Sequence, residues 1–306
     1  MIAVVLAVLA AAANAVASVL QRRAARSAPA DEAFRLGLIF DLVRRPAWLG
    51  GIGALMAGFL LQAAALTNGG LALVQPLLVA ELPITMLLAG RMFRIRVAPK
   101  TWLAVGAVTA GLAGFLAAAS PAPGHRLPGL LTWVISAGVT AGLLACCVAV
   151  AIASGGPARA VLLGVAAGLG FAYTAVLMKR TVEELPGGAR TLAGSWSLWA
   201  MVAAGLCSLF LLQNALHSGP LVAVQPALTV TDPVASTAYG VAMFGEEIRT
   251  GPWVVPELSG MALILYGSML LSKYAPLREQ ARMAGARRHP GAGGGRGGGG
   301  TRPAPR

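Results

Sequence analysis

The chain has 306 residues, of which 57% are hydrophobic and only 11% are charged, and its net charge is +13. Soluble domains carry about 25% charged residues, so this composition excludes an ordinary soluble protein and predicts an all-α polytopic membrane protein. Because the arginines lie between apolar runs and in the tail, a membrane explains them better than nucleic acid does, and we expect no nucleic-acid partner.

Nine apolar segments have about the length that crosses a bilayer. In chain order they cover residues 2–20, 46–66, 70–90, 101–119, 129–151, 159–178, 191–213, 218–243 and 252–272. The first segment has no positive residues before it and arginines after it, so we interpret it as a retained span and not as a cleaved signal peptide.

The distribution of Lys and Arg predicts the orientation, because cytoplasmic loops of membrane proteins are enriched in both. With the N-terminus outside, nineteen of these residues fall on the inner side and five on the outer side. We therefore expect an outer N-terminus and a cytoplasmic C-terminus.

Two charged segments lie outside the spans. The first loop contains "DEAFRLGLIFDLVRRP", which fits either a short amphipathic helix on the inner leaflet or a solvated linker. Residues 273–306 are rich in Gly, Arg and Pro, so we expect a basic, disordered cytoplasmic tail. Membrane lipid is the partner that these arginines would meet, and the alternative is an inert tail.

Two stretches that lie 150 residues apart are close relatives, "VQPLLVAELP" at residues 74–83 and "VQPALTVTDP" at residues 224–233. Four of the six glutamines join this alignment, and glutamines seldom match by chance. The pairs are Gln75 with Gln225, and Gln62 with Gln213 after a one-residue slip. The chain therefore contains an internal repeat.

The same offset pairs whole spans, the second with the seventh, the third with the eighth and the fourth with the ninth. The end of the first span, "VLQRR", also resembles the end of the sixth, "VLMKR". An odd number of spans separates the mates, so the halves face opposite ways, as in many secondary transporters. We expect two inverted four-helix repeats, at residues 1–128 and 152–272, joined by a linker span at 129–151.

Prolines stand at the same places in both repeated stretches. A proline lacks a backbone N–H and disturbs the carbonyl four residues earlier, as Pro83 would free the carbonyl of Val79. The prolines expected to break their helices are Pro76, Pro83, Pro226 and Pro233. Freed carbonyls at membrane depth are tolerated where protein buries them or where they face water, so we expect them beside a central cavity.

Glu81 and Asp232 are carboxylates within apolar spans, one residue out of register with each other. A charge near the bilayer centre costs about 3 kcal/mol on insertion scales. The two acids are expected either to bind a cation or a proton in one cavity, or to pin helices together. The other residues expected on a substrate or ion pathway are Gln75, Gln225, Asn14, Tyr173, Gln62, Gln213 and Thr229.

Motifs for enzymatic chemistry are absent from the sequence. No phosphate-binding G-x-x-x-x-G-K-[ST] loop occurs, and the three histidines lack metal-ligand spacing. We expect neither an enzyme nor an ATP-driven pump, and we expect no cofactor.

Residues 44–78, "RRPAWLGGIGALMAGFLLQAAALTNGGLALVQPLL", resemble the NIPA-type magnesium transporter branch of the drug/metabolite transporter (DMT) superfamily, including its actinobacterial members. The shared features are an Arg-Pro-x-Trp start, a Gly-rich second span, a Leu-Gln near its end and a Leu-Val-Gln-Pro-Leu third span. The resemblance covers roughly residues 1 to 272 and is specific in spans two, three and eight.

The resemblance implies an EamA-like secondary transporter in the plasma membrane and leaves a homodimer open. It does not fix the substrate, so a small organic solute and Mg²⁺ or another divalent cation both stay open. A non-transporting membrane scaffold is the remaining alternative. Glu81 is a departure from this group, whose members often carry an uncharged residue there, so its role is not implied by the resemblance.

Overall fold

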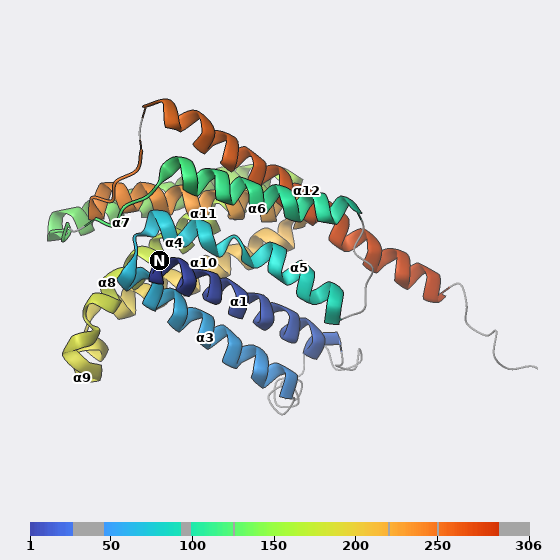
Figure 1. Ribbon diagram of the computed structural model, residues 1–306, viewed down its shortest axis with the longest axis horizontal. Coiled ribbons are helices and arrows are strands. Elements are labelled where there is room, and N and C mark those ends of the chain that lie inside the picture. Colours follow the sequence, from blue (N-terminus) through green and yellow to red (C-terminus); the bar gives the residue numbers. More distant parts are fainter. Residues whose placement is uncertain (27–45, 93–98, 125, 220, 250, 288–306) are drawn as a thin grey trace, which may run out of the picture.

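The computed structural model describes residues 1–306 except 27–45, 93–98, 125, 220, 250 and 288–306, and this part of the chain is helical without a β-strand (Figure 1). Its helices are α1 (Ile2–Arg26), α3 (Pro46–Asn68), α4 (Leu71–Leu78), α5 (Glu81–Met92), α6 (Pro99–Ala119), α7 (Leu130–Ala153), α8 (Gly156–Glu183), α9 (Gly188–Ala193), α10 (Trp196–Ser218), α11 (Leu221–Phe244) and α12 (Val254–Arg287), with short 3₁₀ turns η2 (Leu185–Gly187) and η3 (Gly251–Trp253).

Eight segments of the described chain are long and apolar enough to cross a membrane. They are Ile2–Gln21, Pro46–Asn68, Leu71–Met92, Pro99–Ala119, Leu130–Ala153, Gly156–Glu183, Trp196–Ser218 and Gly251–Leu271. By the length and composition of its helices, the chain is an all-α membrane protein. Helix α11 lies where the sequence predicts a span at residues 218–243, but it is not one of the segments named above. The count of nine spans therefore stays a prediction.

The prediction of a disordered tail from residue 273 onward is wrong at its start, because α12 continues to Arg287. The residues of this extension include Leu, Ala, Arg, Glu, Gln and Met, which are good helix formers, whereas the glycine run begins only at residue 291. The rest of the predicted tail, residues 288–306, lies outside the described residues, as does most of the predicted amphipathic segment in the first loop.

Three antiparallel pairs of long helices build the bundle, α1 with α3, α8 with α10, and α6 with α12 (Figure 1). Small residues at helix contacts in membranes let the backbones approach closely. A Cβ added at Gly111 of α6 would lie 2.6 Å from the carbonyl oxygen of Gly260 of α12. Gly58 of α3 likewise lies against the side chain of Asn14 of α1, and Gly170 of α8 against that of Ser208 of α10, so a glycine allows close approach in each pair.

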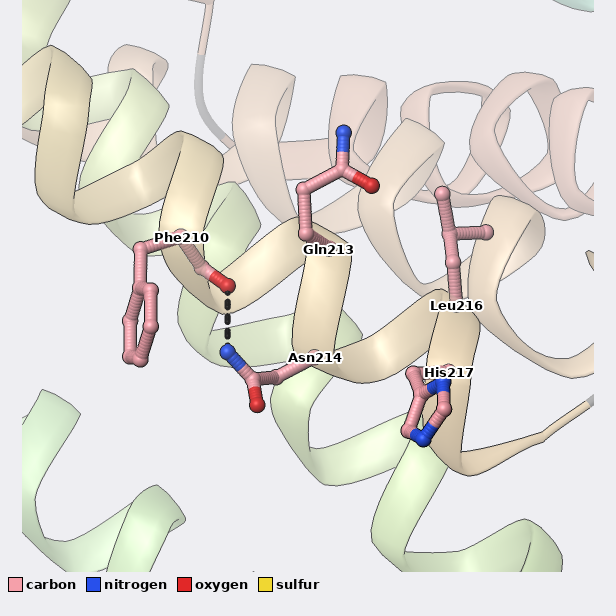
Figure 2. Close-up of a pocket in the computed structure, with 5 residues that line it drawn as sticks. All are labelled: Phe210, Gln213, Asn214, Leu216 and His217. Carbon is pink, nitrogen blue, oxygen red and sulfur yellow. Dashed lines mark hydrogen bonds between the residues drawn. The ribbon is translucent and has the colours of Figure 1, made fainter. Parts of the chain in front are cut away.

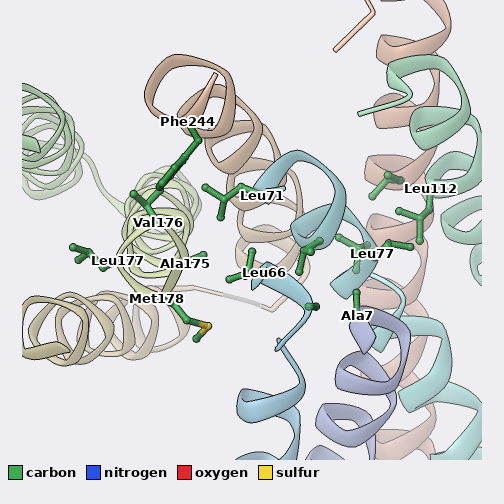
Figure 3. Packing of buried hydrophobic residues seen from close by; sticks show 14 of the residues in the cluster. Ala7, Leu66, Leu71, Leu77, Leu112, Ala175, Val176, Leu177, Met178 and Phe244 are labelled. Atoms are coloured by element: carbon green, nitrogen blue, oxygen red, sulfur yellow. The ribbon is translucent and has the colours of Figure 1, made fainter. Parts of the chain in front are cut away.

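A buried apolar cluster joins the two predicted repeats (Figure 3). Leu66 of α3 and Leu71 of α4 belong to the same cluster as Val176 of α8 and Phe244 of α11. Both α4 and α5 pack against α1 and α6, and α4 also packs against α8 and α11. The two parts of the third span therefore share neighbours in the first repeat, but α4 has more contact with the second repeat through α8 and α11.

Candidate functional site

The third span is interrupted in its middle. Helix α4 ends at Leu78 and α5 begins at Glu81, with a turn at residues 79–80. The amides of Val79 and Ala80 donate to the carbonyls three residues before them, at 3.1 Å each, as in the tightened last turn of a helix. The expected interruption of this span is present, between its two prolines.

The carbonyl of Val79, expected to be freed by Pro83, accepts a hydrogen bond from the amide of Leu82 at 3.1 Å. The turn therefore satisfies this carbonyl. Helix α11 differs from the expectation more strongly, because it is continuous from Leu221 to Phe244 with Pro226 and Pro233 inside it. The prediction that these two prolines break their helix is wrong, since a proline removes one backbone bond and a packed transmembrane helix can accommodate the loss.

Gln75 lies in α4 one turn before the interruption and is 3% exposed. Its amide nitrogen Nε2 has no hydrogen-bond partner within the described part of the chain. A buried donor without a partner costs about 1–3 kcal/mol. Gln75 therefore retains a free donor that water or a bound solute can satisfy.

Glu81 is the first residue of α5, and the hydroxyl of Ser18 in α1 donates to its Oε1 at 3.2 Å. Thr85 follows one turn later on the same face of α5 and is buried. Its hydroxyl also lacks a partner among the described residues. This face of α5 thus combines a carboxylate with spare hydrogen-bonding capacity.

Asp232 lies in α11, where the hydroxyl of Ser236 donates to its Oδ1 at 3.1 Å. Within the residues that the structure describes, no hydrogen bond joins Asp232 to Glu81. Each acid has instead a serine as its partner. The expectation that both acids line one cavity stays a prediction.

Gln225 and Thr229 form a polar group within α11. The Gln225 amide donates to the Thr229 hydroxyl at 3.5 Å, and this hydroxyl donates to the Gln225 carbonyl at 2.8 Å. The hydroxyl of Ser268 in α12 also reaches Thr229, at 3.5 Å. In contrast to Gln75, the repeat-related Gln225 has a side-chain partner on its own helix.

Asn14 and Gln62 lie on the neighbouring helices α1 and α3. The amide oxygen of Asn14 occupies the space that a Cβ at Gly58 would need. Gln62 is half-buried one turn after Gly58. Asn14 thus takes part in the close α1–α3 contact.

Tyr173 of α8 packs edge to face against Tyr239 of α11, with ring centroids 5.6 Å apart. The Tyr173 hydroxyl hydrogen-bonds to Ser136 at 3.3 Å, and the Tyr239 hydroxyl to Thr140 at 2.6 Å. Both partners lie on α7, the predicted linker span. The tyrosine pair therefore connects this linker to the second repeat.

Gln213 is exposed on α10 and lines a hollow together with other residues of this same helix (Figure 2). The side chain of Phe210 beside it is 68% exposed, and Asn214 donates to the Phe210 carbonyl at 2.8 Å. The expectation that Gln213 lines a central pathway is wrong. Its alignment with Gln62 does not imply the same burial, because α10 turns this face away from its partner helix α8.

The most buried carboxylate of the described chain was not among the predicted site residues. Glu246 follows α11 and is 2% exposed. It accepts hydrogen bonds from the amides of Leu71 and Ala72, at 2.7 and 2.8 Å, and so caps the N-terminus of α4. The Nζ of Lys179 lies 2.7 Å from the same carboxylate and 4.3 Å from the ring centroid of Phe244.

This group connects three separate parts of the sequence, because Lys179 lies near the end of α8, Leu71 begins α4 and Glu246 follows α11. In the sequence Lys179 counts as an outer-loop residue, but the structure places it inside α8 with 8% exposure. The signal available in the sequence was a basic residue near the end of one span, Lys179, and an acidic residue after the end of another, Glu246. The local sequence pattern does not reveal that these two ends meet.

Side-chain clusters that would suit a resident metal ion are not seen in the described part of the chain, where no three His, Cys, Asp or Glu residues gather. Glu81, Asp232 and Glu246 each have their own hydroxyl, amide or lysine partners.

Comparison with known proteins gives one informative match. The chain is 27% identical over 278 residues to an uncharacterized protein of Corynebacterium glutamicum, covering 89% of this chain and 93% of that protein. No protein-family model matches the chain, and no solved structure matches it. The two proteins are therefore similar along most of their lengths.

Proposed function

We propose that the chain is a DMT-type secondary transporter that moves a small solute or cation across the membrane by alternating access. The observation that carries the proposal is the interrupted third span, with the unpartnered amide of Gln75 before the turn and Glu81 directly after it. Interrupted helices with polar groups at membrane depth are typical of substrate sites in such transporters.

Symmetric contacts support the inverted repeat on which this function depends. A Cβ at Gly69 would contact Ala3 of α1, and a Cβ at Gly219 would contact Ala160 of α8. Gly69 and Gly219 are 150 residues apart, and α1 and α8 are mates in the sequence repeat. Two contacts of the same kind therefore occur at equivalent places in the two halves.

The helix pairs follow the same pattern. Helices α1 and α3 pack as a pair in the first half, as their mates α8 and α10 do in the second. The other mates pack on each other, α4 with α11 and α6 with α12. A two-fold axis between the halves would produce both kinds of contact.

Transport of a divalent cation, as in the NIPA-type branch, is the narrower version of this proposal. The carboxylates of Glu81 and Asp232 are oxygen ligands, which Mg²⁺ prefers, and Mg²⁺ keeps several of its waters when bound. Two separate carboxylates are therefore chemically sufficient for a hydrated cation that passes through.

A non-transporting scaffold is the alternative from another class. Two hollows of the described chain favour it, because one lies on α10 alone and the other lies between α1 and α5. Neither is located between the two halves, where a transporter would hold its substrate.

Flux into proteoliposomes tests the proposal. The probes are Mg²⁺, detected by an indicator inside the vesicles, and a toxic organic cation chosen from a growth screen of a deletion strain. We expect Glu81→Gln and Asp232→Asn each to reduce the flux of the transported probe about tenfold or more, since each removes a charge within a span. Flux at the wild-type rate in both variants would show that the carboxylates have no part in transport.

A further inference from the structure

Glu246 and Lys179 form a buried ion pair that the proposed transport mechanism does not yet use. We propose that this pair is a gate: it holds one end of the bundle closed by fastening the start of α4 to α8 and to the segment after α11, and it separates when that end opens. This inference rests on the transport function proposed above and assigns the two residues a role in it.

The carboxylate of Glu246 sits in a closely fitted space. A Cβ at Gly70 or at Gly240 would overlap with it. Its two oxygens receive three short hydrogen bonds, from two amides of α4 and from Lys179. The backbone amide of Glu246 also donates to the carbonyl of Gly240 at 3.0 Å. The site is therefore shaped for this one carboxylate.

The segment that carries Glu246 is fastened to the first repeat as well. Glu247 and Ala122 exchange two backbone hydrogen bonds, at 2.9 and 3.2 Å. The amide of Arg249 donates to the carbonyl of Ala119 at 3.0 Å, and the amide of Arg126 donates to that of Phe244 at 3.1 Å. Residues 244–249 thus tie the ends of α6 and α11 together over the same end of the bundle.

The opposite end has no equivalent pair in its sequence. The 150-residue offset places Arg96 at the position of Glu246, and the match of "VLQRR" with "VLMKR" places Arg22 at that of Lys179. In the sequence, the repeat-related positions thus carry two positive residues in place of an acid and a base. The Lys179–Glu246 pair lies at the end where α4 begins, which the Lys/Arg distribution predicts to be the outer one.

A charged pair is suited to such a gate because the free-energy cost of separating the two charges depends on whether water can reach them. Paired and hydrogen-bonded, the two buried charges are stable, but the loss of one partner leaves the other uncompensated. When the end opens, water reaches both groups and compensates for the lost pair. The pair thus favours the closed arrangement without preventing the open one.

Thiol labelling tests the gate without knowledge of the substrate. The reporter is Val74→Cys, a position in α4 that is fully buried, in a background with Cys146, Cys147 and Cys207 changed to Ser. The probe is a membrane-impermeant methanethiosulfonate applied to vesicles of known orientation. We expect slow labelling in the reporter protein and labelling about tenfold faster or more after Glu246→Gln, which leaves Lys179 buried without its partner.

Lys179→Met should accelerate labelling less than Glu246→Gln, because Glu246 keeps its two amide donors from α4. The matched control is Glu247→Gln, which neutralises the neighbouring exposed carboxylate and should leave the rate unchanged. A second reporter, Ala166→Cys in the core of the second repeat, must stay protected in every variant, which shows that the bundle remains folded.

Equal labelling of Val74→Cys in all variants, with Ala166→Cys protected, would overturn the gate. The same holds if Glu247→Gln accelerates labelling as much as Glu246→Gln does. Faster labelling together with no solute flux in any form of the protein would retain the gate and reject the transport function, so the two proposals fail separately.

Discussion

The third and eighth spans begin from nearly the same sequence but differ in structure. Both carry Gln-Pro and a second proline seven residues later, yet α4 and α5 are separated by a turn while α11 is continuous. The prolines alone therefore do not determine the interruption. What differs is the surroundings, because the start of α4 is held by Glu246 and α4 also packs against α8 and α11.

The largest effect is expected where Glu246 holds α4. Gly70→Ala places a methyl group in the space of the Glu246 carboxylate, which separates it from Lys179 and should lower the free energy of unfolding by about 3 kcal/mol. Thermal unfolding in detergent measures this. Gly106→Ala is the matched control, since its Cβ meets no other atom, and an equal loss there would refute a specific role for the carboxylate.

A smaller effect should separate the two spans at their second prolines. Pro233→Ala supplies the N–H that a continuous helix directs to the Thr229 carbonyl. The free energy of unfolding should therefore rise by about 1 kcal/mol. Pro83→Ala brings no such gain, because the Val79 carbonyl already accepts from Leu82. Thermal unfolding in detergent measures both variants, and an equal rise in stability in both would contradict this difference between the two spans.

The smallest effect is expected at the two glutamines. Gln75→Leu removes a buried donor that has no partner and should stabilise the protein by up to about 1 kcal/mol while it impairs transport. Gln225→Leu removes a hydrogen-bond partner of Thr229 and should not stabilise the protein. Thermal unfolding and solute flux, measured on the same preparations, check both parts. Stabilisation by Gln225→Leu of the same size would contradict the distinction between the two spans.

The helices could be predicted from sequence because hydropathy and length are local properties. Eight predicted spans lie where the chain has long apolar helices, and the turn in the third span lies between its two prolines. The continuity of α11 could not be predicted, because the same two prolines are accommodated there by packing. The extension of α12 to Arg287 was missed because the composition of the whole tail was considered together, although its first part contains good helix formers.

The candidate site was only partly accessible to sequence reasoning. Gln75 and Glu81 were found from the repeat and from their polarity in an apolar run. Gln213 was placed in the site because it aligns with Gln62, although alignment does not determine which face of a helix is buried. Glu246 and Lys179 were missed because 67 residues separate them, and only the packing of α8, α11 and α4 brings them together.

Alternating access is tested most directly by the accessibility of Gln75, the residue beside the interruption. Gln75→Cys, in the cysteine-free background and in vesicles of known orientation, is treated with an impermeant thiol reagent from each side in turn. Our account predicts that the cysteine reacts from both sides, more slowly from the side closed by Glu246 and Lys179. A cysteine that reacts from one side only, or from neither, would contradict transport through this part of the protein.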